Sequence, residues 1–442
     1  MTSASILFCV IALCGNPGGT PSAVVDFIRE NLPRTVRTAV TNDATMIAVP
    51  KPFTVPCADE GFRELYYWDT FFTNLGLLRL GNVEQAKNNV EDIAFLIDRY
   101  GYMPNGNRTL FLSRSQPPFF TKMVRDVYEK TQDKAWLGRM YESARREYGF
   151  WQERRMTPSD LNRYSGTFDS DEKRRGTAKY FCGRIGVPYP EDDATRFRYA
   201  ECCIAYCESG WDCTSRFRFN AHEANPICLN SLLYGMESDL AQFAGILGTG
   251  ESVVWKERAA QRRKRMNELM WDMEKGMFCD YDFVMKAKSD IVSAAAFYPL
   301  FVGLATPEQA KRTRMLLPKL EFPYGLAGCE KRDDLQDMQW DYPHGWPPLQ
   351  ALAVYGLRNF GFADEARRIA ATYCRTVEKV FAETGNLWEK YDVTTGRVSV
   401  SKEYKSPAML GWTAGAYLYC LEIAGEKRNG DAPCQMPVNR GL

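Results

Sequence analysis

The segment at residues 80–86, LGNVEQA, has the composition of a tight turn between two helices. A glycine follows an apolar run, and an acidic residue lies in the expected first turn of the next helix. The same arrangement returns at residues 360–366 (FGFADEA), and a looser copy with proline in the turn lies at residues 304–310 (LATPEQA). Repeated helical hairpins across a chain of 442 residues predict a closed ring or a solenoid of helix pairs.

A helix is predicted directly after the first of these turns. Apolar residues recur from Val83 to Ile97 at the spacing of one helix face, and Gly101 follows as a C-cap. Further helices are predicted over residues 23–32, 135–154, 240–247, 251–273, 308–317 and 363–382. Strand-like alternation is confined to residues 397–400, so the predicted fold class is all-α.

The composition is that of a globular protein with a sizeable core, with 45% hydrophobic and 25% charged residues. A net charge of +1 provides no field that would hold nucleic acid or an acidic membrane, and we expect a monomer with neither partner. With only two histidines, His222 and His344, a histidine metal centre or a Ser-His-Asp triad is disfavoured. The fourteen cysteines form no pair of CxxC motifs, which argues against a zinc ribbon, and no metal or cofactor is expected.

The N-terminal segment bears on location. Residues 6–14 form an apolar run long enough for a signal-peptide core, but residues 1–5 carry no lysine or arginine. Free thiols packed as small hydrophobic side chains favour a reducing compartment. We therefore predict a cytoplasmic protein, with a secreted or periplasmic one as the alternative. Residues 1–22 are expected to be an extension, and residues 23–442 a single catalytic domain.

Five stretches combine carboxylates, aromatic rings and amides between glycines and prolines. They lie at residues 62–72 (FRELYYWDTFF), 103–119, 207–216 (CESGWDCTSR), 339–350 (QWDYPHGWPPLQ) and 388–412. A sugar site needs these groups, since flat rings cover the apolar faces of pyranoses, polar side chains bond hydroxyls, and two carboxyls act as acid and base. Taken locally, Asp212 is as well explained as a helix N-cap, and Glu389 as a surface partner of Lys390.

Together, and in this order, the five stretches resemble the trehalase family of glycoside hydrolases from about residue 56 to residue 421. The resemblance implies an (α/α)6 toroid that hydrolyses α,α-trehalose with inversion and without a metal. It implies Asp212 as the general acid and Glu389 as the general base. It also places at substrate-binding positions Trp68, Asp69, Asn105, Arg114, Ser115, Gln116, Gly210 and Glu403. We expect the remaining pocket residues to be Trp340, Asp341 and Trp346.

The chain departs from the family pattern at groups that hold the sugars. Gly61 stands where the family has a sugar-binding arginine, and the family's Arg-Pro-Glu-Ser segment is missing. We expect Arg184, in the segment GRIG at residues 183–186, to act in its place. These departures leave open a different α-linked disaccharide as substrate. A non-catalytic carbohydrate-binding relative and a phosphorylase are disfavoured, because both catalytic carboxylates are present.

Overall fold

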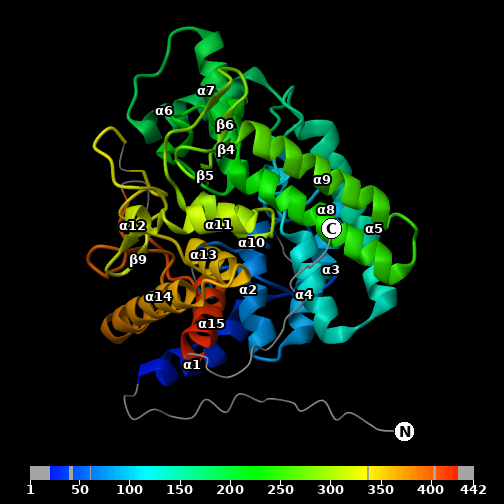
Figure 1. Ribbon diagram of the computed structural model, residues 1–442, viewed down its shortest axis with the longest axis vertical. Coiled ribbons are helices and arrows are strands. Elements are labelled where there is room, and N and C mark those ends of the chain that lie inside the picture. Colours follow the sequence, from blue (N-terminus) through cyan, green and yellow to red (C-terminus); the bar gives the residue numbers. More distant parts are fainter. Residues whose placement is uncertain (1–19, 39–42, 60, 336–337, 402–404, 427–442) are drawn as a thin grey trace.

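Six helices form a closed inner ring in the part of the chain that the computed structural model describes, residues 20–38, 43–59, 61–335, 338–401 and 405–426. They are α2 (Tyr67–Arg79), α4 (Phe120–Thr131), α8 (Ile227–Leu247), α10 (Tyr298–Phe301), α13 (Pro347–Asn359) and α15 (Gly411–Gly425). Each packs against the next in this order, and α15 packs against α2, so the ring closes (Figure 1). The predicted (α/α)6 toroid is confirmed.

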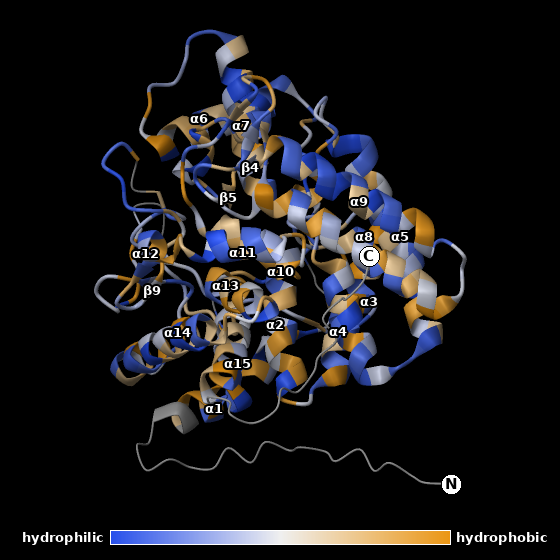
Figure 2. Cartoon of the chain, in the orientation of Figure 1, coloured by the Kyte–Doolittle hydropathy of each residue, from blue (hydrophilic) through white to orange (hydrophobic). Residues whose placement is uncertain are grey.

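An outer layer of helices covers this ring. Its members are α1 (Thr20–Asn31), α3 (Val83–Tyr100), α5 (Lys134–Arg155), α9 (Ser252–Leu269), α11 (Pro307–Arg314) and α14 (Ala363–Thr384). Apolar and polar residues alternate along outer helices such as α14 in Figure 2, as expected of helices that pack on one side and meet water on the other. The predicted outer helices are thus found, although α9 and α11 end a few residues earlier than predicted.

Glycines make the turns from inner to outer helices. Gly81 connects α2 to α3 with φ of 80°, and Gly361 connects α13 to α14 with φ of 79°. Gly303, with φ of 72°, holds the corresponding place after α10. A side chain is disfavoured in this left-handed region, so glycine is the natural residue there. The repeated sequence segments therefore correspond to repeated turns of the toroid.

Two of the inner helices, α8 and α15, are apolar on nearly every side. Residues 411–420 of α15 are all buried, and so is almost all of α8. Both pack against their neighbours in the ring and against the outer layer, so little of their surface is left to water. This arrangement places the core of the molecule between the two layers of helices.

A helical hairpin between α5 and α8 extends the ring. It consists of α6 (Asp171–Ile185) and α7 (Asp193–Ser209), which pack against each other and lie at the top of Figure 1. The first half of α6 carries three consecutive basic residues, at positions 173–175. A shorter helix, α12 (Leu317–Leu320), and 3-10 turns, among them η1 (Leu32–Thr35) and η2 (Thr109–Ser113), complete the helical part.

The strands are two residues long and lie in the loops between helices. They are β1 (Val36–Arg37), β2 (Phe53–Thr54), β3 (Ala224–Asn225), β4 (Trp271–Asp272), β5 (Met277–Phe278), β6 (Tyr281–Asp282), β7 (Ala287–Lys288), β8 (Glu321–Phe322), β9 (Gly325–Leu326), β10 (His344–Gly345) and β11 (Tyr391–Asp392). All pairings are antiparallel. The strand predicted over residues 397–400 is wrong, because only Val398 makes an isolated bridge there, with Tyr391.

Candidate active site

The five aromatic and carboxylate stretches lie next to the N-terminal ends of inner helices. Residues 62–72 enter α2, residues 103–119 lead into α4, and residues 207–216 precede α8. Residues 339–350 enter α13, and residues 388–412 lead into α15. Since the inner helices form a ring with these ends on one side, the loops gather at one mouth of the toroid.

Asp212 is positioned by the end of α7. That helix stops at Gly210, whose φ is 70°, and the chain then turns into Trp211 and Asp212. A Cβ atom on Gly210 would lie 2.9 Å from the indole of Trp68. Glycine at this position therefore allows the Asp212 loop to pass directly against the first turn of α2.

Hydrogen bonds from the 339–350 stretch hold this loop. Asp341 accepts from the Thr214 hydroxyl at 2.6 Å and from the Ser215 amide at 2.9 Å, and Gln339 Nε2 donates to the Asp212 carbonyl at 3.1 Å. Asp341 is 2% exposed and its two oxygens serve these donors. Asp341 and Gln339 thus both hold the Asp212 loop, and the substrate-binding role of Asp341 stays a prediction.

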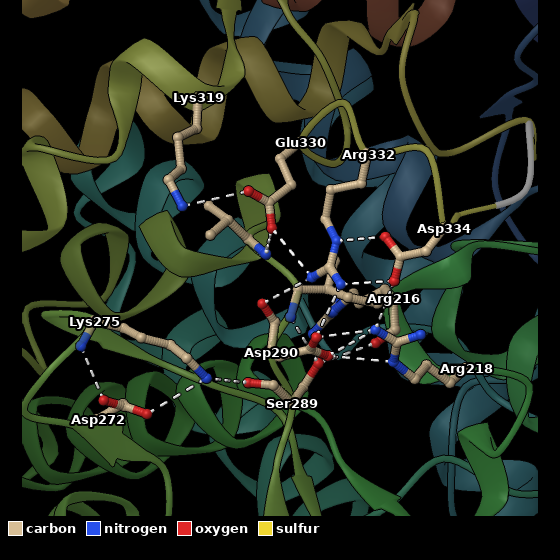
Figure 3. A network of polar contacts seen from close by, with 12 residues as sticks. Arg216, Arg218, Asp272, Lys275, Ser289, Asp290, Lys319, Glu330, Arg332 and Asp334 are labelled. Carbon is tan, nitrogen blue, oxygen red and sulfur yellow. Dashed lines mark hydrogen bonds and ion pairs between the residues drawn. The ribbon is translucent and has the colours of Figure 1, made fainter.

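An ion-pair network anchors the far side of the same loop (Figure 3). Arg218 pairs with Asp290 at 2.9 Å and with Asp334 at 3.3 Å. Arg332 pairs with the same two carboxylates, at 3.0 and 2.7 Å. The network joins the loop after Asp212 to the segment that precedes the 339–350 stretch, so these parts of the mouth are fixed relative to each other.

Glu389 is buried beside its chain neighbour Lys390. The Lys390 Nζ lies 2.6 Å from Glu389 Oε2, and the lysine and glutamate side chains are 0% and 2% exposed. The ammonium also lies 4.7 Å from the centroid of the Trp346 ring. The Glu389 carbonyl accepts from Trp412 Nε1 at 3.1 Å, which ties this stretch to the first turn of α15. The predicted surface pairing of Glu389 with a lysine is wrong, since the pair lies in the interior.

A cluster of indoles packs between the loops. Trp340 stacks on Trp346 with ring centroids 3.8 Å apart and planes 2° apart, and on Trp211 at 5.3 Å. Trp68 and Trp412 meet these rings at 5.6 to 6.5 Å. All five are at most 5% exposed, so the cluster is a rigid support for the loops that carry the carboxylates.

The 103–119 stretch is bonded to both α2 and α7. Gln116 Oε1 accepts from the Trp68 amide at 3.2 Å, and Asn105 Nδ2 donates to the Cys207 carbonyl at 3.3 Å. The Ser115 amide donates to Glu208 Oε1 at 2.8 Å. These contacts place Asn105, Ser115 and Gln116 next to the Asp212 loop.

Glu208 is the hub of these contacts and was missed from the sequence. Its fully buried carboxylate receives two hydrogen bonds from Arg155, at 2.7 and 2.8 Å, and one from the Ser165 amide at 2.7 Å. A paired charge of this kind braces three segments at once. It lies in the quoted stretch CESGWD, but no local signal distinguishes it from a surface glutamate.

The site carboxylates influence one another electrostatically. Burial raises the pKa of Asp69 to about 7, its own backbone amide opposes the rise, and the charges of Glu389 and Asp212 add to it. Burial also raises the pKa of Asp212, against the charges of Arg184 and Arg114. Asp69 therefore lies within electrostatic reach of both Asp212 and Glu389.

Arg184 acts on both sides of this site. Burial disfavours its charge, but the nearby Asp212 carboxylate keeps the pKa of the guanidinium above its usual range. Its charge also contributes to lowering the pKa of Lys390, for which burial is the largest cause and Glu389 an opposing one. The arginine thus lies within electrostatic reach of both the Asp212 and the Glu389 side. Glu403, also predicted here, lies outside the described residues.

The described part of the chain shows no metal site, no disulfide and no membrane-spanning helix. No cluster of three or more His, Cys, Asp or Glu residues there has the arrangement of a metal site. The eleven cysteines located there are free thiols, and all except Cys207 are buried. Among the described helices, none has the length and apolar character that a bilayer span requires.

Two carboxylates with unlike surroundings, arginines and aromatic rings at the mouth of an (α/α)6 toroid define a glycoside hydrolase. The trehalase family model matches residues 22–425, and the chain belongs to the trehalase family. The periplasmic trehalase of Xanthomonas campestris pv. campestris is 36% identical over 88% of this chain and 72% of its own. The periplasmic trehalase of Escherichia coli O1:K1 is 32% identical, over 90% of this chain and 73% of its own length.

Solved structures agree with this assignment. Neutral trehalase Nth1 from Saccharomyces cerevisiae matches with a TM-score of 0.73 and 32% identity, over 84% of this chain and 73% of its own. Mannosylglycerate hydrolase from Thermus thermophilus matches with a TM-score of 0.62 at 17% identity, over 90% of this chain and 99% of its own, which shows a common fold only. The cytoplasmic location predicted from the free thiols is not supported, because the bacterial relatives are named periplasmic enzymes.

Proposed function

We propose that this protein hydrolyses α,α-trehalose to glucose with inversion of configuration. The observation that carries the proposal is the pair Asp212 and Glu389, which lie on the loops that precede α8 and α15. The charges of both carboxylates contribute to raising the pKa of Asp69. The names of the bacterial and yeast relatives support trehalose as the substrate. The names of the bacterial ones also support a periplasmic location, which cell fractionation tests.

Asp212 serves as the general acid in this proposal. Its carboxyl must carry a proton in the Michaelis complex and give it to the glycosidic oxygen as the bond to the anomeric carbon breaks. Burial raises its pKa and so favours the protonated form. Arg184 and Arg114 oppose this effect in the free enzyme.

Glu389 serves as the general base. It takes a proton from a water molecule that attacks the anomeric carbon from the face opposite the leaving oxygen. The base must be ionised, and the ammonium of Lys390 at 2.6 Å favours its charged form. One glucose is thus released as the β-anomer and the other as the α-anomer, which proton NMR distinguishes.

A comparison of two substrates tests both roles. In α-D-glucosyl fluoride the leaving fluoride departs without protonation, whereas in trehalose the leaving oxygen needs the acid. Asp212→Asn should lower kcat on trehalose by about 10²- to 10⁴-fold and lower it much less on the fluoride. Glu389→Gln should lower kcat on both substrates, since the attacking water is common to them. Equal losses on the two substrates in Asp212→Asn would contradict its assignment as the acid.

A further inference from the structure

We propose that Tyr180, together with Arg184 on the same face of α6, forms a subsite that holds the second sugar ring of the substrate, the one that leaves. The inference rests on the proposed function and adds a binding group to it. Tyr180 belongs to none of the five sequence stretches that resemble the family.

Tyr180 does not belong to the core of the α6–α7 hairpin. The neighbouring apolar residues Ala178, Phe181 and Ile185 are 0 to 6% exposed, and they form the side of α6 that packs into the protein. Tyr180 is 58% exposed. Burial of its ring therefore contributes little to folding, and the ring is available to a ligand.

Arg184 lies one turn further along α6. Residues four apart on a helix share a face, and the guanidinium carbon of Arg184 is 5.6 Å from the centroid of the Tyr180 ring. Unlike Tyr180, Arg184 is half-buried. The pair thus combines a ring open to solvent with a partly buried cation.

The electrostatic surroundings connect this pair to the catalytic loop. Partial burial raises the pKa of the Tyr180 hydroxyl, the charge of Arg184 opposes this, and Cys207 and Asp212 add to the rise. The carboxylate of Asp212 likewise acts on Arg184. The same end of α6 packs against the last turns of α7, where the ring centroids of Phe181 and Tyr206 lie 5.8 Å apart, and α7 leads directly into the Asp212 loop. Tyr180 and Arg184 therefore lie on the Asp212 side of the mouth.

The position beside the acid decides which ring the pair meets. Asp212 gives its proton to the oxygen that leaves, so a sugar next to this side of the site is the leaving ring. An aromatic face covers the apolar C–H face of a pyranose, and a guanidinium donates to its hydroxyls. The ligand class is therefore a neutral hexopyranose as the leaving group of an α-glucoside.

The test compares trehalose with α-D-glucosyl fluoride, which lacks the second ring. Tyr180→Ala should lower kcat/KM for trehalose by about 3- to 10-fold, mainly through KM, because one ring contact is lost. The same variant should leave kcat/KM for the fluoride at the wild-type value. Tyr180→Phe keeps the ring and should behave as wild type on both substrates.

Tyr189→Ala is a matched control. Tyr189 lies in the same hairpin, is 37% exposed and also has an arginine over its ring, Arg196 at 4.8 Å, but its hydroxyl bonds the Arg175 carbonyl. It should not change either rate. The inference is overturned if Tyr180→Ala equals wild type on trehalose, or if it loses as much on the fluoride. A wild type that cleaves neither substrate overturns the proposed function, and the subsite with it.

Discussion

Replacing Lys390 by methionine removes the cation beside the proposed base and keeps most of its apolar volume. The Lys390 Nζ lies 2.6 Å from Glu389 Oε2, and neither side chain is more than 2% exposed. At an effective dielectric constant of about 20, unit charges at this separation attract by roughly 6 kcal/mol before the cost of burying them. Removing one partner of such a pair destabilises a protein by about 3–5 kcal/mol, because the other charge stays buried without compensation.

The Glu389 carboxylate can relieve the cost of losing this ammonium by taking up a proton. A cost of about 3–5 kcal/mol corresponds to about two to four pH units, so we expect the acidic limb of the kcat/KM profile for trehalose to move upward by about that much. Below both limbs the variant should be about 10²- to 10⁴-fold slower than wild type, and at high pH it should recover much of the rate. The direction follows from the need for an ionised base.

The assay is the pH dependence of kcat/KM on trehalose and on α-D-glucosyl fluoride, since both need the base. Lys264→Met is the control, because Lys264 is 79% exposed and its partner carboxylate, Glu268, is 4.0 Å away. The melting temperature of each variant shows whether the fold is kept. A folded Lys390→Met protein with a wild-type acidic limb would refute the role of this lysine in keeping the base charged.

Three further predictions concern buried and strained groups. Burial raises the pKa of Glu147 to about 8 from 4.5, so the folded protein keeps a proton that the unfolded chain loses. The free energy of unfolding should therefore fall by about 1.4 kcal/mol per pH unit across that window, and Glu147→Gln should flatten the dependence in urea titrations. Asp341→Ala should destabilise by about 1–3 kcal/mol for each donor it orphans, the Thr214 hydroxyl among them, and should also lower kcat. Gly61→Arg should lower the melting temperature without lowering KM for trehalose, because φ there is 113° and a Cβ would lie 3.2 Å from Cys57 Sγ.

The outer layer of the toroid was readable from the sequence, whereas the inner ring was not. An outer helix such as α3 or α14 has one buried face and one solvent-exposed face, so apolar residues recur in its sequence with a period of 3.6. An inner helix such as α15 is buried all round, so its residues show no such alternation. For α8 only the last turns, residues 240–247, were predicted. The packing that makes these segments helical is tertiary, and it leaves no local trace.

The carboxylates of the site were found because they stand in long motifs with fixed neighbours. Their supports were missed because each depends on a contact far away in the chain. Glu208 matters through Arg155, and Gln339 through the carbonyl of Asp212, more than a hundred residues apart in the second case. Tyr180 looks like any surface tyrosine until its exposure and its distance from Arg184 are known.

The different surroundings of Asp212 and Glu389 suit the opposite roles that we propose for these two similar groups. Glu389 has an ammonium in direct contact, which stabilises its charge inside the protein. For Asp212 burial is the dominant influence and raises its pKa, and the charges of Arg184 and Arg114 offset only part of the rise. Environments that push two carboxyls toward opposite protonation states assign one as acid and the other as base. Placing an ammonium against the Asp212 carboxylate, as Lys390 stands against Glu389, would therefore be expected to cost activity even though it added a favourable ion pair.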